Sequence, residues 1–346
     1  MRLAIHQNKN IYDHPATWDE IWIKFCEDND IEYEIIDCFR TDIIAVLRKF
    51  DIVVWHYQNY VLQEMMFARS ILNIAQGMGL KVFPDFNSSW HYDDKISESL
   101  LLRSCNSPIP DFWFFSEKNK ALDWIEKDAS FPLIAKLKCG AGSHNVKLIK
   151  SKSQAVKYIN RMFGKGYKSS PNLLFKASSN FRSAKSLEEK RKRISKIPKF
   201  LLTLSRSRRF GRERDYVYFQ DFIPNKGYDL KIIVIGEKAF FFARPIRSGD
   251  FRASGGGTAL YDRTLVPKNV VISAFETSDK LKFQCMGYDF VVDERSCEGK
   301  IIEMSYGFSY EYLEKGSGYW DRNFVWHEEK INLASEIIRS LLKLEN

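Results

Sequence analysis

The sequence predicts an α/β protein of two or three packed subdomains, and three observations support this prediction. The chain has 346 residues, which exceeds the usual size of one domain. Its first ninety residues alternate strand-like and helix-like patterns, and such alternation predicts a parallel sheet covered by helices. From Gly227 onward the apolar patterns are mostly those of antiparallel strands.

The N-terminal segment, residues 1–92, is expected to contain four strands separated by three helices. The strands are expected at RLAIH, YEIID, DIVVWH and KVFP, and the helices over 17–28, over 42–50 and up to Gly77. Thr17 and Glu20 have the spacing of a capping box at the start of the first helix. The apolar face of that helix is expected to be core rather than a binding platform, and it consists of Trp18, Ile21, Trp22 and Phe25.

The middle of the chain predicts a second α/β unit. A loop rich in Asp, Asn and Ser follows Pro84 and marks a boundary, and a helix is expected to begin near Asp94. Linking helices are expected over residues 93–130. The stretch FPLIAKLKCGAGSHNVKLI predicts two strands around a Gly-rich turn, and YVYFQDFIP predicts a third strand. Residues 131–222 would therefore form a central subdomain that carries a basic insertion at 161–215.

The last segment, residues 223–346, predicts antiparallel strands and a closing helix over about 328–344. In DLKIIVIGEKAFFFARPI, a two-residue turn at Gly236 and Glu237 predicts a hairpin. This register places Asp229 opposite Arg244, with Lys231 on the same face. One acid and two cations could hold a ribose hydroxyl and a polyphosphate. An ordinary cross-strand ion pair is the alternative, and the pattern alone favours it.

Asp289 and Glu303 are the most informative acidic pair. If the loop between them closes a hairpin, Val292 lies opposite Lys300, and the same register places Asp289 opposite Glu303, roughly 5 Å apart at Cβ. Two carboxylates so placed repel each other unless a cation lies between them, and hard oxygen ligands favour magnesium over zinc. Ser305 faces the same way. Two solvated acids on a sheet surface are the alternative, which the pattern leaves open.

Two glycine-rich segments could bind phosphate. Gly140 and Gly142, with Ser143, would let backbone N–H groups approach a phosphate closely, but the segment has neither Walker nor Rossmann spacing. The run GDFRASGGG offers Arg252 beside flexible backbone. Spacing does not decide between a surface loop and an anion clamp in either segment.

The net charge of +9 is unevenly distributed, because residues 161–215 contain 17 Lys or Arg against 4 Asp or Glu. This segment predicts an anionic partner such as a phosphate-rich ligand, nucleic acid or membrane surface. A solvated surface insertion is an equally good interpretation. The insertion contains few aromatic residues, which argues against stacking of the bases of a single-stranded nucleic acid. No stable nucleic-acid complex is expected.

A cytoplasmic protein is expected. The six cysteines are scattered without a CxxC pair, which is typical of reduced thiols. No stretch approaches the about 20 apolar residues of a membrane span, and the N-terminus lacks the apolar core of a signal peptide.

Taken in order, five segments resemble the ATP-grasp superfamily and, within it, the RimK-like carboxylate–amine ligases. They are DDKISESLLL, FPLIAKLKCGAGS, VYFQDFIPNKGYDLKIIVIGEKAFFFARPIRSGDFRASGGG, GYDFVVD and IIEMS. The resemblance covers roughly residues 84–310. It implies an ATP-grasp fold with an N-terminal parallel α/β subdomain, a central lid subdomain, and a C-terminal, mostly antiparallel subdomain that holds the metal and phosphate site.

The resemblance also implies a role for each matching residue. The ATP phosphates would be bound by Lys95, Lys136 and the loop containing Gly140, Gly142 and Ser143. Adenine would be held by Gln220, Asp221, Phe222 and Ile223. Around the ribose and the transferred phosphoryl group would lie Asp229, Lys231 (where the family usually has Arg), Arg244 and Arg252. The metal ligands would be Asp289, Glu303 and Ser305. Ser305 and Ser254 replace family asparagines, which leaves the magnesium geometry open.

The implied activity is an ADP-forming ligase that uses ATP and Mg²⁺ to convert a carboxylate into an acyl phosphate, which an amine then attacks. The segments SYGFSYEYLEKGSGYWD and WHYDDK resemble a branch associated with bacterial surface-polysaccharide clusters. That resemblance implies an amino acid, a sugar acid or a nucleotide sugar as substrate. Two alternatives stay open, a kinase acting on a sugar or glycan hydroxyl and a degenerate binding protein with an anionic partner. A homodimer is also left open.

Overall fold

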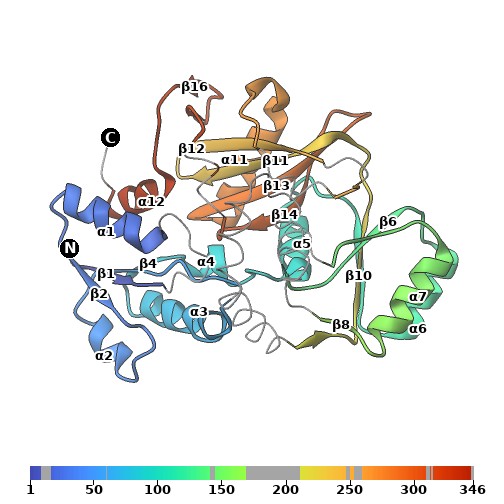
Figure 1. Ribbon diagram of the computed structural model, residues 1–346, viewed down its shortest axis with the longest axis horizontal. Coiled ribbons are helices and arrows are strands. Elements are labelled where there is room, and N and C mark those ends of the chain that lie inside the picture. The colour runs from blue at the N-terminus through green and yellow to red at the C-terminus, as the bar shows by residue number, and fades with distance from the viewer. Residues whose placement is uncertain are drawn as a thin grey trace, which may run out of the picture. The chain divides into compact units, whose positions relative to one another are not determined.

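A computed structural model describes residues 1–8, 17–59, 61–140, 145–168, 211–246, 250–252, 259–308, 312 and 315–343. The chain divides into two units (Figure 1). The first unit combines Met1–Pro110 with Ile223–Asn346, and the second unit is Asp111–Phe222. The second unit is therefore an insertion into the first.

A parallel sheet of order β2-β1-β3-β4 forms the N-terminal part of the first unit. Its strands are β1 Leu3–His6, β2 Tyr33–Ile36, β3 Ile52–Val54 and β4 Lys81–Phe83. The connecting helices are α1 Trp18–Asp28, α2 Ile43–Leu47 and α3 Leu62–Gly77. Figure 1 shows α1 on one face of the sheet and α2 and α3 on the other. Strands β1 and β3 are buried along their whole length because helices cover both faces. The predicted alternation is confirmed.

Helix α1 packs its predicted apolar face into the core. The backbone N–H of Thr17 donates to Glu20 Oε2 at 2.8 Å, so the glutamate of the predicted capping box satisfies the helix start. Trp18 and Trp22 are buried, and Trp22 Nε1 donates to the Ala334 carbonyl at 2.9 Å. This bond ties the N-terminal layer to the last helix of the chain.

Asp19, also on α1, gives stability a pH dependence. Burial raises its pKa from 3.8 to about 6, while a hydrogen bond from Thr17 acts in the opposite direction. Between these two values the folded chain holds a proton that the unfolded chain has released, so stability falls as pH rises through this window. We expect Asp19→Asn to raise the free energy of unfolding by about 1–3 kcal/mol at about pH 8, and by much less at about pH 4. Urea unfolding at both pH values measures this difference, and an equal gain at both would contradict the assignment.

The C-terminal part of the first unit is an antiparallel sheet of order β14-β13-β11-β12-β15-β16. The strands are β11 Asn225–Ile235, β12 Lys238–Pro245, β13 Cys285–Asp293, β14 Gly299–Ser305, β15 Tyr319–Trp320 and β16 Trp326–His327. The two-residue turn at Gly236 is confirmed, since Ile235 pairs with Lys238 and Gly236 has a φ of +55°, which suits glycine.

The helices of the first unit outside the parallel sheet differ partly from the prediction. They are α4 Phe86–Ser89, α5 Lys95–Ser104, the 3₁₀ turn η1 Arg263–Leu265, α11 Lys268–Leu281 and α12 Leu333–Leu342. Helix α5 begins as predicted, with Asp94 accepting from the Ser97 N–H. Helix α11 was missed. Helix α12 begins five residues later than predicted, because Asn332 caps it by accepting from the Ser335 N–H.

The second unit has its own sheet of order β5-β10-β6-β7 and its own core. The strands are β5 Phe112–Phe115, β6 Leu133–Lys136, β7 Lys147–Ile149 and β10 Val217–Asp221. Helices α6 Lys118–Lys127 and α7 Lys152–Met162 pack against one another beside it. The strands predicted within 131–149 and 216–224 are confirmed, but β5 was missed because residues 93–130 were expected to be helices only.

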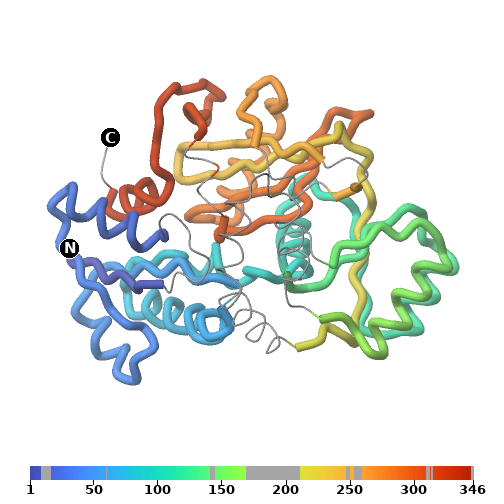
Figure 2. Tube along the Cα trace, in the orientation of Figure 1, coloured from blue at the N-terminus to red at the C-terminus, as the bar shows by residue number. Residues whose placement is uncertain are grey.

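Strands β5 and β10 are antiparallel neighbours, so the chain enters and leaves the second unit side by side (Figure 2). A short ribbon of β8 Tyr167–Lys168 and β9 Arg212–Glu213 flanks the greater part of the basic insertion. Residues 169–210 lie outside the described part of the chain. No helix in the described ranges is both long enough and apolar enough to cross a membrane.

Candidate functional site

The β13–β14 hairpin brings the predicted acidic pair together. Asp289 pairs with Glu303 across the two strands, as predicted. The register near the turn was predicted wrongly, because Val291, not Val292, pairs with Lys300. A β-bulge between the two regions adds Ile302 to β14 and shifts the register by one residue. The bulge therefore places Glu303 beside Asp289.

Asp289 is buried and lies between an acid and two cations. On the β11 side, Lys231 is its register partner, and Lys231 Nζ lies 2.7 Å from Asp289 Oδ1. Arg244 also contacts the same oxygen, at 3.1 Å. Burial acts to raise the pKa of Asp289, but Lys231 and Arg244 outweigh burial and hold the pKa below its usual value. Asp289 is therefore an anion, and Lys231 lies on the side of it away from Glu303.

Asp229 and Arg244 form the second predicted pair. They are register partners on β11 and β12, and Arg244 Nε lies 3.1 Å from both carboxylate oxygens of Asp229. The side chain of Asp229 is fully buried, at 0% exposure. Burial raises the pKa of Asp229 to about 7, while the Arg244 charge opposes the shift. Arg244 thus links the two aspartates, and this geometry holds its guanidinium in a fixed orientation.

Helix α5 adds two charged groups. Lys95 at its first position is buried, and Lys95 Nζ lies 3.2 Å from Glu303 Oε1. Glu98, one helical turn further on, is buried as well and accepts weakly from the Met304 N–H at 3.5 Å. Burial raises the pKa of Glu98 to about 8, and Lys95 acts against that rise. The sequence interpretation missed Glu98, although its i, i+3 spacing from Lys95 on a predicted helix was a usable signal.

These residues form one charged surface on the antiparallel sheet. Glu303, Asp289 and Lys231 follow one another across β14, β13 and β11 through direct register pairs. Ser305 follows Glu303 at the spacing of one sheet face, and its Oγ accepts from the Gly307 N–H at 3.0 Å. An alternation of carboxylates and cations on a half-buried surface can hold a polyphosphate and its counter-ion.

The donor set fits magnesium. Two carboxylates and one hydroxyl are hard oxygen ligands, and Mg²⁺ is usually held by one or two carboxylates with substrate phosphates completing the shell. In the described parts of the chain no group of three or more His, Cys, Asp or Glu is arranged to hold a metal ion. Two carboxylates such as Asp289 and Glu303 suit a magnesium ion that substrate phosphates also coordinate.

The second unit positions a separate group of predicted residues. Lys136 on β6 and Gln220 on β10 are both buried, and Lys136 Nζ donates to Gln220 Oε1 at 2.8 Å. Asp221 and Phe222 follow Gln220 at the end of this unit, whereas Ile223 begins the second segment of the first unit. Gly140 has a φ of +117°, a conformation that side chains disfavour. Gly142 and Ser143 lie outside the described residues.

Arg252 has a partner that the sequence interpretation did not name. Its Nε lies 2.9 Å from Asp250 Oδ1, and its Nη2 lies 2.6 Å from Asp250 Oδ2. The Arg252 guanidinium is the main cause that lowers the pKa of Asp250. The described part of this loop is limited to residues 250–252, and Ser254 falls outside it.

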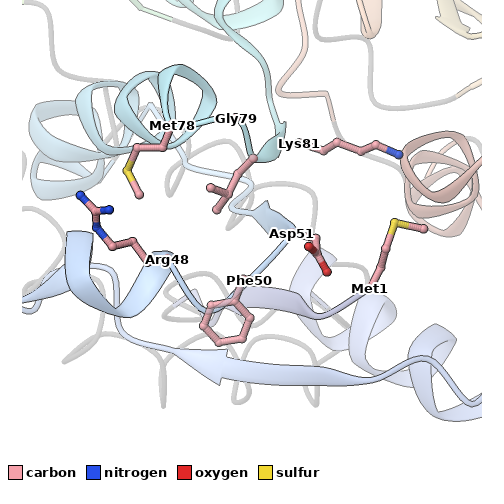
Figure 3. A pocket seen from close by; sticks show the side chains of 8 residues that line it. Met1, Arg48, Phe50, Asp51, Met78, Gly79 and Lys81 are labelled. Atoms are coloured by element: carbon pink, nitrogen blue, oxygen red, sulfur yellow. The ribbon is translucent and has the colours of Figure 1, made fainter.

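A hollow of about 680 Å³ lies elsewhere in the first unit, near the start of the chain (Figure 3). Its lining includes Met1, Phe50, Asp51, Met78 and Lys81. Two of its charged side chains have structural partners, since Asp51 Oδ2 accepts from the Arg2 N–H and Lys81 Nζ donates to the Leu341 carbonyl. Among the predicted site residues that the structure describes, none lines this hollow.

Comparison with known proteins shows the fold. No family model matches the chain, and no curated protein matches its sequence. Among solved structures, a RimK-domain ATP-grasp protein from Sphaerobacter thermophilus is similar over 99% of this chain and 100% of that chain, with a TM-score of 0.57 and 12% identity. The D-alanine–D-alanine ligase from Bacillus anthracis, in complex with ATP, has a TM-score of 0.57 and 13% identity over 99% of this chain and 97% of that chain.

A third similar structure is the macrocyclase MdnC from Microcystis aeruginosa, bound to its precursor peptide MdnA. It has a TM-score of 0.55 and 12% identity, over 99% of this chain and 100% of that chain. The parallel N-terminal sheet, the inserted unit and the antiparallel sheet define an α/β protein of several layers. The arrangement that these structures share with the chain is the ATP-grasp fold, as the sequence predicted.

Proposed function

We propose that the chain is an ATP- and magnesium-dependent ligase that forms an acyl phosphate from a carboxylate and couples it to an amine. The main support for this proposal is the charged surface in which Glu303, Asp289 and Lys231 are neighbours across three strands. Lys95 forms an ion pair with Glu303, and Arg244 forms one with Asp289. The solved structures named above include ligases with the same fold, which supports the proposal.

Each residue of this surface has a role in the proposal. Asp289, Glu303 and Ser305 would hold magnesium, which neutralises charge on the terminal phosphate oxygens. Lys95, Lys231 and Arg244 stabilise the negative charge that spreads over the transferred phosphoryl group. Ion pairs with Glu303, Asp289 and Asp229 hold these cations in place, so binding requires little further ordering of the side chains.

The remaining predicted residues would bind the nucleotide or act when the amine attacks. Lys136 would contact the phosphates together with Gly140, Gly142 and Ser143, and the segment from Gln220 to Ile223 would hold adenine. Asp229 orients Arg244 and lies near the ribose. Arg252 stabilises the oxyanion that forms when the amine attacks the acyl carbon.

Residues 131–222 are proposed as the lid that excludes water, which would otherwise hydrolyse the acyl phosphate. The subdomains at 1–92 and 223–346 would provide the remaining two parts of the fold. An amino acid, a sugar acid or a nucleotide sugar in surface-polysaccharide synthesis is the proposed substrate class. A cytoplasmic enzyme and a homodimer are part of the same proposal.

The products of ATP turnover test the reaction class. We expect ADP and phosphate, released only when a carboxylate and an amine are both present, because the acyl phosphate needs an acceptor. A screen of sugar acids and amino acids with coupled detection of ADP measures this release. AMP and pyrophosphate would instead indicate an adenylating enzyme, and turnover with a single hydroxyl co-substrate would indicate a kinase.

A further inference from the structure

The ribbon of β8 and β9 is connected by hydrogen bonds to residues on both sides of the Gly-rich segment, Lys138 before it and Asn145 after it. Tyr167 pairs with Glu213 and Lys168 pairs with Arg212 across the ribbon. Gly166, just before β8, has a φ of +62°, and a Cβ at that position would collide with the Glu213 carbonyl. Gly166 and the Glu213 backbone therefore pack too closely to leave space for a side chain at the start of the ribbon. Most of the basic insertion that the ribbon flanks lies outside the described residues.

Tyr216 joins this ribbon to the segment that follows Lys136. The backbone N–H of Lys138 donates to the Tyr216 hydroxyl oxygen at 2.6 Å. The Tyr216 hydroxyl in turn donates to Glu213 Oε2 on β9. Burial, followed by this hydrogen bond to Glu213, raises the pKa of Tyr216 well above its usual value, so the hydroxyl keeps its proton. The backbone at Lys138 is therefore fixed through Tyr216 to the ribbon.

Two further contacts join β8 to the same segment. Asn145, on the far side of the Gly-rich turn, donates from Nδ2 to the Lys168 carbonyl at 2.9 Å. Tyr167 stacks on Tyr158 with ring centroids 5.5 Å apart, and the Tyr158 hydroxyl donates to the Lys136 carbonyl at 3.4 Å. Three separate contacts thus run from the ribbon to residues that precede and follow the turn.

We propose that Tyr216, held by Glu213, is a positioning residue for the nucleotide phosphates, and that it makes ATP affinity dependent on the ribbon at the base of the basic insertion. The proposal rests on the function proposed above, which assigns Lys136 and Gly140 to the phosphates. The ordering matters because backbone N–H groups bind phosphate well only when they are held in place before binding. The hydrogen bond at Lys138 supplies that order two residues before Gly140.

Tyr216→Phe tests the proposal because it removes the hydroxyl and keeps the ring. Loss of the acceptor for the Lys138 N–H is expected to weaken ATP binding, measured by calorimetry, about tenfold. The KM for ATP should rise by a similar factor with little change in kcat. Tyr167→Phe is the matched control on the same ribbon, because it keeps the stacked ring and removes a hydroxyl that makes no hydrogen bond to the described residues. This variant should bind ATP as the wild type does.

Glu213 provides a rescue test. Glu213→Gln keeps an acceptor for the Tyr216 hydroxyl and should bind ATP nearly as tightly as the wild type. Glu213→Ala removes that acceptor and should reproduce most of the Tyr216→Phe loss. Equal affinities for both Glu213 variants and the wild type would overturn the role of Glu213 in holding Tyr216.

Hydrogen exchange without nucleotide separates this inference from the proposed function. In Tyr216→Phe the Lys138 amide should exchange about tenfold faster, while the amides of Leu133 to Ala135 are unchanged. Unchanged exchange at Lys138 together with unchanged ATP affinity would overturn the inference and leave the proposed function intact. Failure of the wild type to bind ATP would instead sink the proposed function, while faster exchange at Lys138 would still show that Tyr216 orders this segment.

Discussion

Glu303→Gln is expected to lower kcat for ADP release about a thousandfold or more, because a metal ligand beside the transferred phosphate contributes several kcal/mol to the transition state. The variant keeps the size of the side chain and loses its negative charge. Glu303 is partly exposed, with 27% of its side chain accessible, so the change should leave the hairpin folded. Steady-state ADP release at saturating magnesium, with circular dichroism to check folding, measures the effect.

Glu298→Gln is the matched control for this experiment. Glu298 lies at the loop end of the same hairpin, and its exposed side chain pairs with Lys300 at 3.4 Å. A solvated pair of this kind contributes little, so activity should stay within about twofold of the wild type. Turnover that survives in Glu303→Gln and still requires magnesium would show that the ion is bound elsewhere.

Asp229→Ala is expected to lower the free energy of unfolding by about 3–5 kcal/mol, because removing one partner of a buried ion pair leaves the other charge without compensation. Asp229 is fully buried against Arg244. The loss should lie toward the lower end of this range, since Arg244 keeps its contact with Asp289 at 3.1 Å. Urea unfolding without nucleotide, followed by circular dichroism, measures the change.

An exposed ion pair gives the comparison. Asp42 pairs with Arg40 at the protein surface, where solvent screens the pair, so Asp42→Ala should leave the free energy of unfolding close to that of the wild type. Asp229→Asn, which retains one acceptor for Arg244, should fall between the two alanine variants. If Asp229→Ala and Asp42→Ala lower the free energy of unfolding by similar amounts, the buried pair stabilises the fold no more than the exposed pair does.

The sequence predicted most of the architecture for identifiable reasons. Strands β1 and β3 are short apolar runs between amphipathic helices, and that alternation admits few arrangements. The β11–β12 register followed from the turn at Gly236, because a two-residue loop determines every later pair. Asp229 could therefore be placed opposite Arg244 without knowledge of the tertiary structure.

The β13–β14 hairpin shows where sequence reasoning stops. The predicted register was one residue out near the turn and right at Asp289 and Glu303, because the bulge at Ile302 adds the missing residue. A bulge depends on packing and on bonds to distant segments. Here the neighbouring Ile301 N–H donates to the Pro108 carbonyl at 2.7 Å, a contact that no local pattern reveals.

The candidate site was predicted unevenly for a similar reason. Glu98 could have been found from helical spacing, since it follows Lys95 by one turn. Tyr216 could not, because its direct contact with Lys138 joins residues 78 positions apart and the neighbouring strands β8 and β9 are too short to give a sequence pattern. Helix α11 was missed because the segment from Gly227 onward was interpreted as mostly antiparallel strands up to the closing helix.

The first and last residues of the second unit lie next to each other, and this is useful for protein engineering. The Asp221 N–H donates to the Asp111 carbonyl at 2.8 Å, so the two cut points of an excised fragment 111–222 already meet. The fragment also has its own apolar core, so we expect it to fold when expressed alone. We expect the first unit to tolerate its removal if a short linker joins Pro110 to Ile223. Such modularity would also allow the equivalent piece of another protein to be grafted at the same junction.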